Sequence, residues 1–148
     1  MSTTDKAPPI AKITTTLSVG CQDFDPDQLT QIAGHPPSDI WRAKVQGVKG
    51  NPAFNQIEWS YSQAKKPHWS IDDAVRELLD SFRERRDSIL AFAKKYDCSL
   101  HLSLQLHGDS TMIVYGIERE TVELLAAFRC SISFVIDFDF IDQNSRLH

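Results

Sequence analysis

The chain has 148 residues, of which 41% are hydrophobic and 24% are charged, and its formal net charge at pH 7 is −4. This length suits one domain with one core, and the acidic balance argues against a general nucleic-acid binder. Three scattered cysteines exclude a disulfide scaffold, and no apolar run approaches the roughly 20 residues that cross a bilayer. Without a secretion signal at its start, the sequence predicts a cytoplasmic protein.

The sequence is expected to divide into two tails and one domain. Residues 1–10 are polar and contain prolines, as is typical of a flexible tail, and the polar residues 143–148 are expected to be loose. Residues 11–142 carry the periodic patterns of a single α+β domain.

The first part of this domain predicts two strands around a short helix. Between 11 and 19, apolar and polar residues alternate, which is typical of a strand with one buried face. Asp25 and Pro26 fit the start of a helix that ends at Gly34. Residues 38–53, rich in Lys, Gly and Pro, predict an irregular loop, and the alternation at 57–61 predicts the next strand.

The clearest helical pattern runs from 71 to 96. Ser70 and Asp73 have the spacing of a capping box, and apolar residues recur every three or four positions. This pattern predicts one amphipathic helix of about seven turns. The leucines between 100 and 106 alternate with polar residues and predict a strand, whose hairpin partner is expected at 111–115.

The C-terminal part predicts one more helix and one more strand. The helix is expected over 118–128, with Val122, Leu125 and Ala126 at packing positions. The strand is expected over 132–140, with a buried row of Ile and Phe side chains.

From residue 54 onward, the expected order is strand, helix, strand, strand, helix, strand. This order predicts a ferredoxin-like βαββαβ antiparallel sheet, preceded by an extra N-terminal strand–helix unit. The helices would pack on one face of the sheet, against the Leu row and the Ile/Phe row. The opposite face would be polar, because a one-residue slip would bury His101 and His107 without partners.

No catalytic or metal-binding set emerges from the sequence. Neither a G-x-S-x-G motif nor a glycine-rich phosphate loop is present. His101 and His107 are six positions apart on a strand, roughly 20 Å, which is too far for one ion. Asp137 and Asp139 would lie roughly 6–7 Å apart on one strand face, but no substrate-positioning groups accompany them. We therefore expect no enzyme activity, no metal and no cofactor.

Two surface features are predicted to contact a partner. The first is an acidic patch near the C-terminus, comprising Glu118, Glu120, Glu123, Asp137 and Asp139. The second is Trp41, which stands beside Arg42 in the expected irregular loop, because exposed aromatic side chains often anchor protein interfaces. Residues 42–66 form a contrasting basic stretch with Glu58 as its one acidic residue.

The stretch TLSVGCQDFDPDQLTQIAGHPPSDIWRAKVQG, followed by the strand IEWSYS, resembles the bacterial domain-of-unknown-function family 4279. The shared features are a strand, a helix capped by Asp-Pro and ended by Gly and Pro, and a Trp-bearing strand. A long helix, two strands, a short helix and a final acidic and aromatic strand follow. The resemblance covers most of residues 13–140. Members are similar to small proteins from bacterial polymorphic-toxin neighbourhoods, which implies an immunity role.

Three functions remain open at this point. The leading hypothesis is a non-catalytic immunity protein whose acidic surface binds a basic toxin domain, such as a nuclease, because opposite charge speeds association. The alternative is a small-molecule sensor or ligand-binding domain, which would need a concave apolar pocket. The third is an enzyme or RNA-binding protein that uses the basic stretch 42–66, which would need solvent-facing rings at Trp59 and Tyr61. Their alternation with polar residues predicts buried rings instead.

Overall fold

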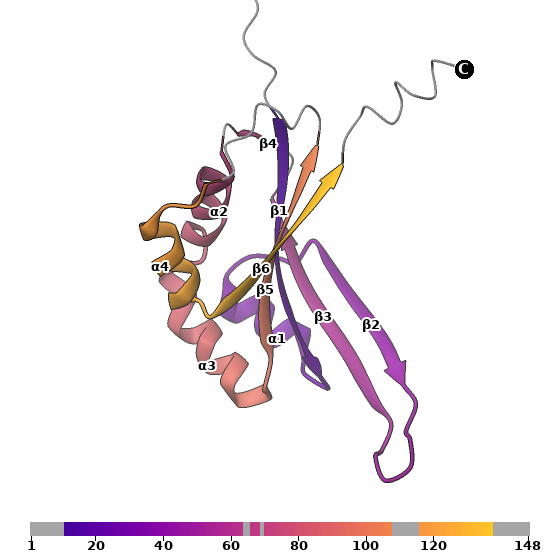
Figure 1. The fold of residues 1–148 in the computed structure, drawn as a ribbon. Coiled ribbons are helices and arrows are strands. Elements are labelled where there is room, and N and C mark those ends of the chain that lie inside the picture. The colour runs from indigo at the N-terminus through magenta and orange to yellow at the C-terminus, as the bar shows by residue number, and fades with distance from the viewer. Residues whose placement is uncertain (1–10, 64–65, 69, 108–115, 138–148) are drawn as a thin grey trace, which may run out of the picture.

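The computed structural model describes residues 11–63, 66–68, 70–107 and 116–137. In this part of the chain a layer of helices covers one face of a β-sheet, and no described helix covers the opposite face (Figure 1). The predicted tails and the predicted strand at 111–115 lie outside the described residues.

The strands, in chain order, are β1 (Ala11–Gln22), β2 (Asp39–Val45), β3 (Phe54–Ser62), β4 (Lys66–His68), β5 (Ser99–His107) and β6 (Cys130–Asp137). The helices are α1 (Pro26–Ala33), α2 (Ile71–Asp80), the 3₁₀ turn η2 (Arg83–Arg85), α3 (Arg86–Tyr96) and α4 (Arg119–Ala127). The strand order is β2-β3-β1-β5-β6, and β4 pairs with the start of β1. The fold is therefore α+β, with the helices on one face as predicted.

The strand β1, which was expected to belong to an extra N-terminal unit, is the central strand of the sheet. β1 pairs antiparallel with β3 on one side and with β5 on the other, so that Leu17 lies opposite both Tyr61 and Leu102. The predicted βαββαβ unit that begins at residue 54 is therefore wrong, because β1 lies between two of its strands, β3 and β5. The expectation of a wholly antiparallel sheet is also wrong, since β6 runs parallel to β5. Parallel neighbours need a crossover connection, and α4 lies in it.

The first helix forms as its sequence predicts. The Asp25 side chain accepts the backbone N–H of Asp27 at 3.0 Å, and Pro26 occupies the first helical turn. Gly34 ends the helix in the left-handed region, with φ of 76°, and its N–H donates to the Thr30 carbonyl at 3.1 Å. The conformation at Gly34 is one that glycine adopts without steric cost.

The single helix predicted over 71–96 is wrong, because the chain breaks at Ser81 and Phe82 into α2 and α3. Phe82 has φ of −113° and ψ of 6°. Its buried ring contacts the rings of His35 and Tyr61, with centroids 4.9 and 5.1 Å away. Nε2 of His35 donates to the Ser81 carbonyl at 3.0 Å. The break thus places Phe82 in the core and gives the Ser81 carbonyl a partner outside the helix.

The loop predicted over 38–53 is also wrong in its first half, where β2 pairs antiparallel with β3. Most of the side chains of β2 are exposed. The β2–β3 hairpin extends past the helix layer (Figure 1). A strand with so little buried surface lacks the alternating apolar pattern on which sequence prediction depends.

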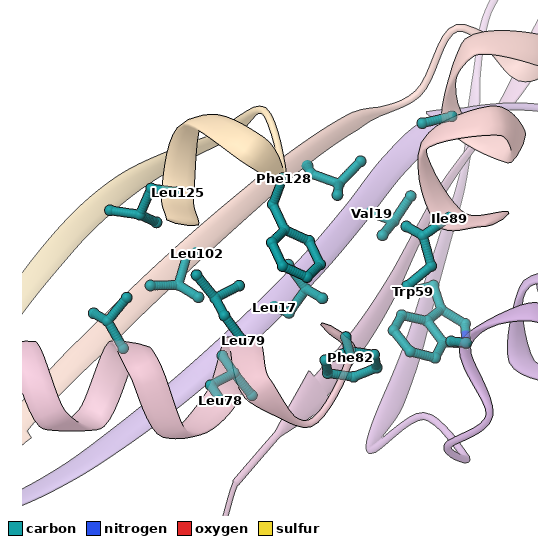
Figure 2. Packing of buried hydrophobic residues seen from close by; sticks show 14 of the residues in the cluster. Leu17, Val19, Trp59, Leu78, Leu79, Phe82, Ile89, Leu102, Leu125 and Phe128 are labelled. Carbon is teal, nitrogen blue, oxygen red and sulfur yellow. The ribbon is translucent and has the colours of Figure 1, made fainter. Parts of the chain in front are cut away.

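The core lies between the sheet and the helices (Figure 2). The predicted leucine row of β5 is buried, with Leu102 and Leu104 completely inaccessible to solvent. Trp59 is 1% exposed, and its indole N–H donates to the Thr30 hydroxyl at 3.0 Å. The buried position of Trp59 confirms the prediction for that ring, whereas Tyr61, for which burial was also predicted, is only partly buried.

The C-terminal elements are less buried than predicted. Phe134 of β6 is 44% exposed, Val122 of α4 is 52% exposed and Ala126 of α4 is also exposed, so these three predicted packing positions are wrong. The packing face of α4 is formed instead by Thr121 and Leu125, and is continued by Phe128. None of the described helices is long and apolar enough to span a bilayer.

Two buried threonines allow a matched test of core packing. Within the described residues, the fully buried hydroxyl of Thr121 has no hydrogen-bond partner, whereas the equally buried Thr15 hydroxyl donates to Oε1 of Gln63 at 3.3 Å. We expect Thr121→Val to raise the free energy of unfolding by about 1 kcal/mol, because it removes an unsatisfied buried group, and Thr15→Val to lower it by a similar amount. Guanidinium unfolding curves measure both. A loss of stability in Thr121→Val would contradict the conclusion that the buried Thr121 hydroxyl lacks a hydrogen-bond partner.

Candidate functional site

A buried carboxylate joins the starts of α2 and α4. The Ser70 side chain caps α2 by accepting the N–H of Asp73 at 3.1 Å, as predicted. Asp72, in the same first turn, is 5% exposed. One of its oxygens accepts the backbone N–H of Glu118 at 2.8 Å, and the other pairs with Nε of Arg76 at 3.1 Å. Asp72 therefore holds the N-terminal end of α4 against α2.

The two helices joined by Asp72 enclose a groove of about 640 Å³. Five of its lining residues are acidic: Asp73, Glu77 and Asp80 from α2, and Glu120 and Glu123 from α4. Arg76 and Arg83 also line it, as do the apolar residues Leu124 and Ala127. We call this surface the acidic groove.

Both arginines of the acidic groove are already ion-paired. Arg83 pairs with Asp80 at 2.7 Å, and Arg76 pairs with Asp73 at 3.2 Å in addition to Asp72. The hydrogen bond that Arg76 donates to Asp73, followed by the charge of Asp72, raises the pKa of the Arg76 guanidinium above its ordinary value. Among the described residues, neither Glu120 nor Glu123 takes part in an ion pair, so the α4 wall carries the uncompensated negative charge.

Only part of the predicted acidic patch is brought together. Glu120 and Glu123 line the acidic groove, and Glu118 is the exposed N-cap of α4, where its charge acts on Arg76. Asp137 is the last residue of β6, in register with His107. Asp139 lies outside the described residues.

Trp41 lies far across the sheet from the acidic groove. It is on β2, at the opposite end of the strand order from β6, and is 51% exposed. Its neighbour across the strand pair is Glu58. The predicted exposure is confirmed, but Trp41 belongs to a strand and not to the predicted irregular loop.

The α2 wall of the acidic groove was missed by sequence reasoning. Asp73, Glu77 and Asp80 have the i, i+4, i+7 spacing of one helix face. That spacing is a readable signal for an acidic face. Its pairing with α4 is a tertiary contact, which the spacing alone does not reveal.

The uncovered face of the sheet carries a hydrogen-bonded histidine. His101 lies between two serines of β6, with Nδ1 2.6 Å from the Ser131 hydroxyl and Nε2 2.8 Å from the Ser133 hydroxyl. These bonds connect β5 to β6. Within the described ranges, no three His, Cys, Asp or Glu side chains converge as a metal site requires.

A second cavity of about 650 Å³ lies where α3 ends and where β5 and β6 begin. Leu90, Ala91, Ala93 and Leu100 give it an apolar wall, and Lys94 and Arg129 add two cations. Asp97, Cys98, Ser99 and Ser131 complete its lining. We call it the α3–β6 pocket.

The role of Asp72 can be tested by unfolding measurements. We expect Asp72→Ala to lower the free energy of unfolding by about 1–3 kcal/mol, because the Glu118 N–H and the Arg76 guanidinium each lose a buried acceptor. Asp72→Asn should cost less, since an amide oxygen can still accept from Glu118. The control is Asp73→Asn, whose exposed ion pair should contribute no more than about 0.5 kcal/mol. Equal losses in Asp72→Ala and Asp73→Asn would contradict this role.

Comparison with known proteins identifies the family of this chain. No curated protein and no solved structure matches the chain. A family model matches residues 11–139, a range that includes every described element from β1 to β6. The resemblance read from the sequence is thereby confirmed, and the chain belongs to the family described as Domain of unknown function (DUF4279).

Proposed function

We propose that this chain is a non-catalytic immunity protein that binds and neutralises a basic toxin domain in the cytoplasm. The observation that carries the proposal is the acidic groove, a concave surface of about 640 Å³ with five carboxylates on two helices. A toxin that acts on nucleic acid must be basic to bind phosphates, and such a surface attracts and orients it.

The internal ion pairs of the acidic groove favour this use. Arg76 and Arg83 are both paired with acids of α2, so an incoming lysine or arginine need not displace them. Glu120 and Glu123 lie on the opposite wall and have no ion pair among the described residues. A partner cation that enters the groove would therefore meet Glu120 and Glu123 first, while the charge of Glu118 adds to the local potential.

Trp41, Asp137 and Asp139 stay predicted contacts, and Trp41 lies apart from the acidic groove. Trp41 is on a different edge of the sheet, so a partner that uses both surfaces would have to reach around the molecule. The Trp41→Ala variant tests that contact independently.

The growth-protection experiment co-expresses this chain with the protein encoded in the neighbouring reading frame, which the proposal expects to carry a toxin domain. We expect the wild-type chain to restore growth and the double variant Glu120→Lys/Glu123→Lys to fail. Its affinity for the purified toxin domain should fall on the order of 10- to 100-fold, because two attractive contacts become repulsive. Glu84→Lys/Asp87→Lys, at two exposed positions of η2 and α3 that do not line the groove, is the matched double charge reversal and should behave as the wild type.

Salt dependence gives the second measurement. The affinity of the wild-type chain should weaken between low and high ionic strength, and that of the double variant should change less. If the double variant protects cells and binds as tightly as the wild type, the acidic groove is not the binding surface. If the neighbouring protein is not toxic, or is toxic but not bound, the immunity function is wrong.

The strand order also supports a finer proposal on the fold. β1, α1, β2, β3, the α2–α3 pair and β5 follow one another as a βαββαβ unit, with strand order β2-β3-β1-β5 and antiparallel pairing throughout. We propose that this unit is ferredoxin-like. In that case α4 and β6 extend this βαββαβ unit at its C-terminal end.

The α3–β6 pocket favours a second candidate function, the binding of a small ligand. Its apolar wall beside Lys94 and Arg129 suits a molecule with an acidic head and an apolar body. Decanoate is a suitable probe because it has both parts.

We expect decanoate to raise the melting temperature by roughly 3 °C at tenfold excess over its Kd. Lys94→Gln should reduce this shift, because it removes a lining cation. Lys95→Gln is the matched control, since Lys95 lies over the Tyr96 ring and does not line the pocket. Equal shifts in the two variants, or an equal shift with neutral decanol, would contradict a binding site at this pocket.

A further inference from the structure

Two cysteines that are distant in sequence face each other where β1 ends and β5 begins. The antiparallel register pairs Gly20 with Ser99, so its next step places Cys21 opposite Cys98. By the alternation of their strands, both side chains lie on the helix-covered face of the sheet. Cys21 is 6% exposed, and Cys98 is partly buried against the same core.

The backbone at this position suits a covalent bond between the two sulfurs. The N–H of Cys98 donates to the Ala93 carbonyl at 2.7 Å, so it makes no ladder bond to Cys21. Opposed residues of this kind have α-carbons about 4.5 Å apart, which is inside the range that disulfides span. The two thiols are free, and they are close enough for each to influence the pKa of the other.

The α3–β6 pocket gives a small oxidant a route to this pair. Cys98 lines the pocket, whereas Cys21 lies behind it in the core. The third cysteine, Cys130, pairs in register with Leu100 and faces no thiol among the described residues. Cys98 is therefore placed to react first, and Cys21 to react with the product.

We propose that Cys21 and Cys98 form a reversible intrachain disulfide when the protein meets an oxidant of the peroxide class. The Cys98 thiolate attacks one oxygen of the peroxide, the O–O bond breaks, and the leaving hydroxide takes a proton to become water. The Cys21 sulfur then attacks the resulting sulfenic acid, and the S–O bond breaks as the S–S bond forms. A second water leaves with the Cys21 proton, so two thiols and one hydrogen peroxide give one disulfide and two waters.

Burial of the two thiols lowers the rate of this reaction. Burial raises the pKa of both thiols, and for Cys98 the hydrogen bond with Cys21 raises it further. Little thiolate is then present at neutral pH, and its fraction grows about tenfold per pH unit. The bond should therefore form slowly and respond to sustained oxidation. Once formed, it would connect the end of α3 to the central strand, whatever partner the acidic groove binds.

The experiment treats the full chain and its Cys130→Ser variant with hydrogen peroxide and maps the peptides without reduction. We expect a linked Cys21–Cys98 peptide in both proteins, formed faster at pH 9 than at pH 7 and reversed by dithiothreitol. The oxidised protein should melt roughly 5 °C or more above the reduced one, because the crosslink restricts the unfolded chain. The Cys21→Ser variant should instead accumulate a sulfenic acid at Cys98, which dimedone labels.

Two outcomes would overturn the proposal, and both can be read without a substitution at Cys21 or Cys98. One is oxidation of Cys98 to sulfinic acid without a linked peptide. The other is crosslinking through Cys130, seen as dimers that disappear in the Cys130→Ser variant. Because these outcomes do not depend on a cysteine substitution in the core, an unstable Cys21→Ser or Cys98→Ser protein would not obscure them.

Discussion

The alternation of side chains along β1 is the constraint on which the rest of the structure depends. Ile13, Thr15, Leu17 and Val19 are buried on one face, while Thr14, Thr16 and Ser18 lie on the opposite, polar face. β1 is bordered by β3 and β4 on one side and by β5 on the other, so its register fixes theirs. A slip of one residue would turn the apolar set of β1 away from the helices, which makes any other register costly.

The break at Ser81 and Phe82 distributes the helices over this sheet. A continuous helix would keep one direction, whereas the break lets α2 pack against α4 and α3 pack against α1. The α2–α4 contact creates the acidic groove, and the end of α3 borders the α3–β6 pocket. The buried Phe82 ring and its contacts with the partly buried His35 and Tyr61 lie at this break, and so they help to position both concave surfaces.

Sequence patterns predicted the local elements because their signals are local. The caps at Asp25 and Ser70, the leucine alternation of β5 and the helix that became α4 all depend on neighbours within a few positions. The central place of β1 and the parallel direction of β6 depend on pairing between distant strands, which residue periodicity does not encode. The candidate site also combines a local signal with a long-range contact. Glu120 and Glu123 were predicted from the local charge pattern alone. Their position opposite Asp73 and Glu77 needed the α2–α4 contact.

The acidic groove is difficult to explain as a device for stability. Carboxylates on facing walls repel one another, and the arginine pairs on α2 leave the charge of α4 uncompensated. Exposed ion pairs contribute little to stability, so these pairs do not account for the accumulation of acids. Asp72 nevertheless holds the two walls together through buried bonds, which keeps the repelling groups close. A rigid contact that maintains a repulsive surface is expected where a binding partner, and not the folded chain itself, supplies the opposite charge.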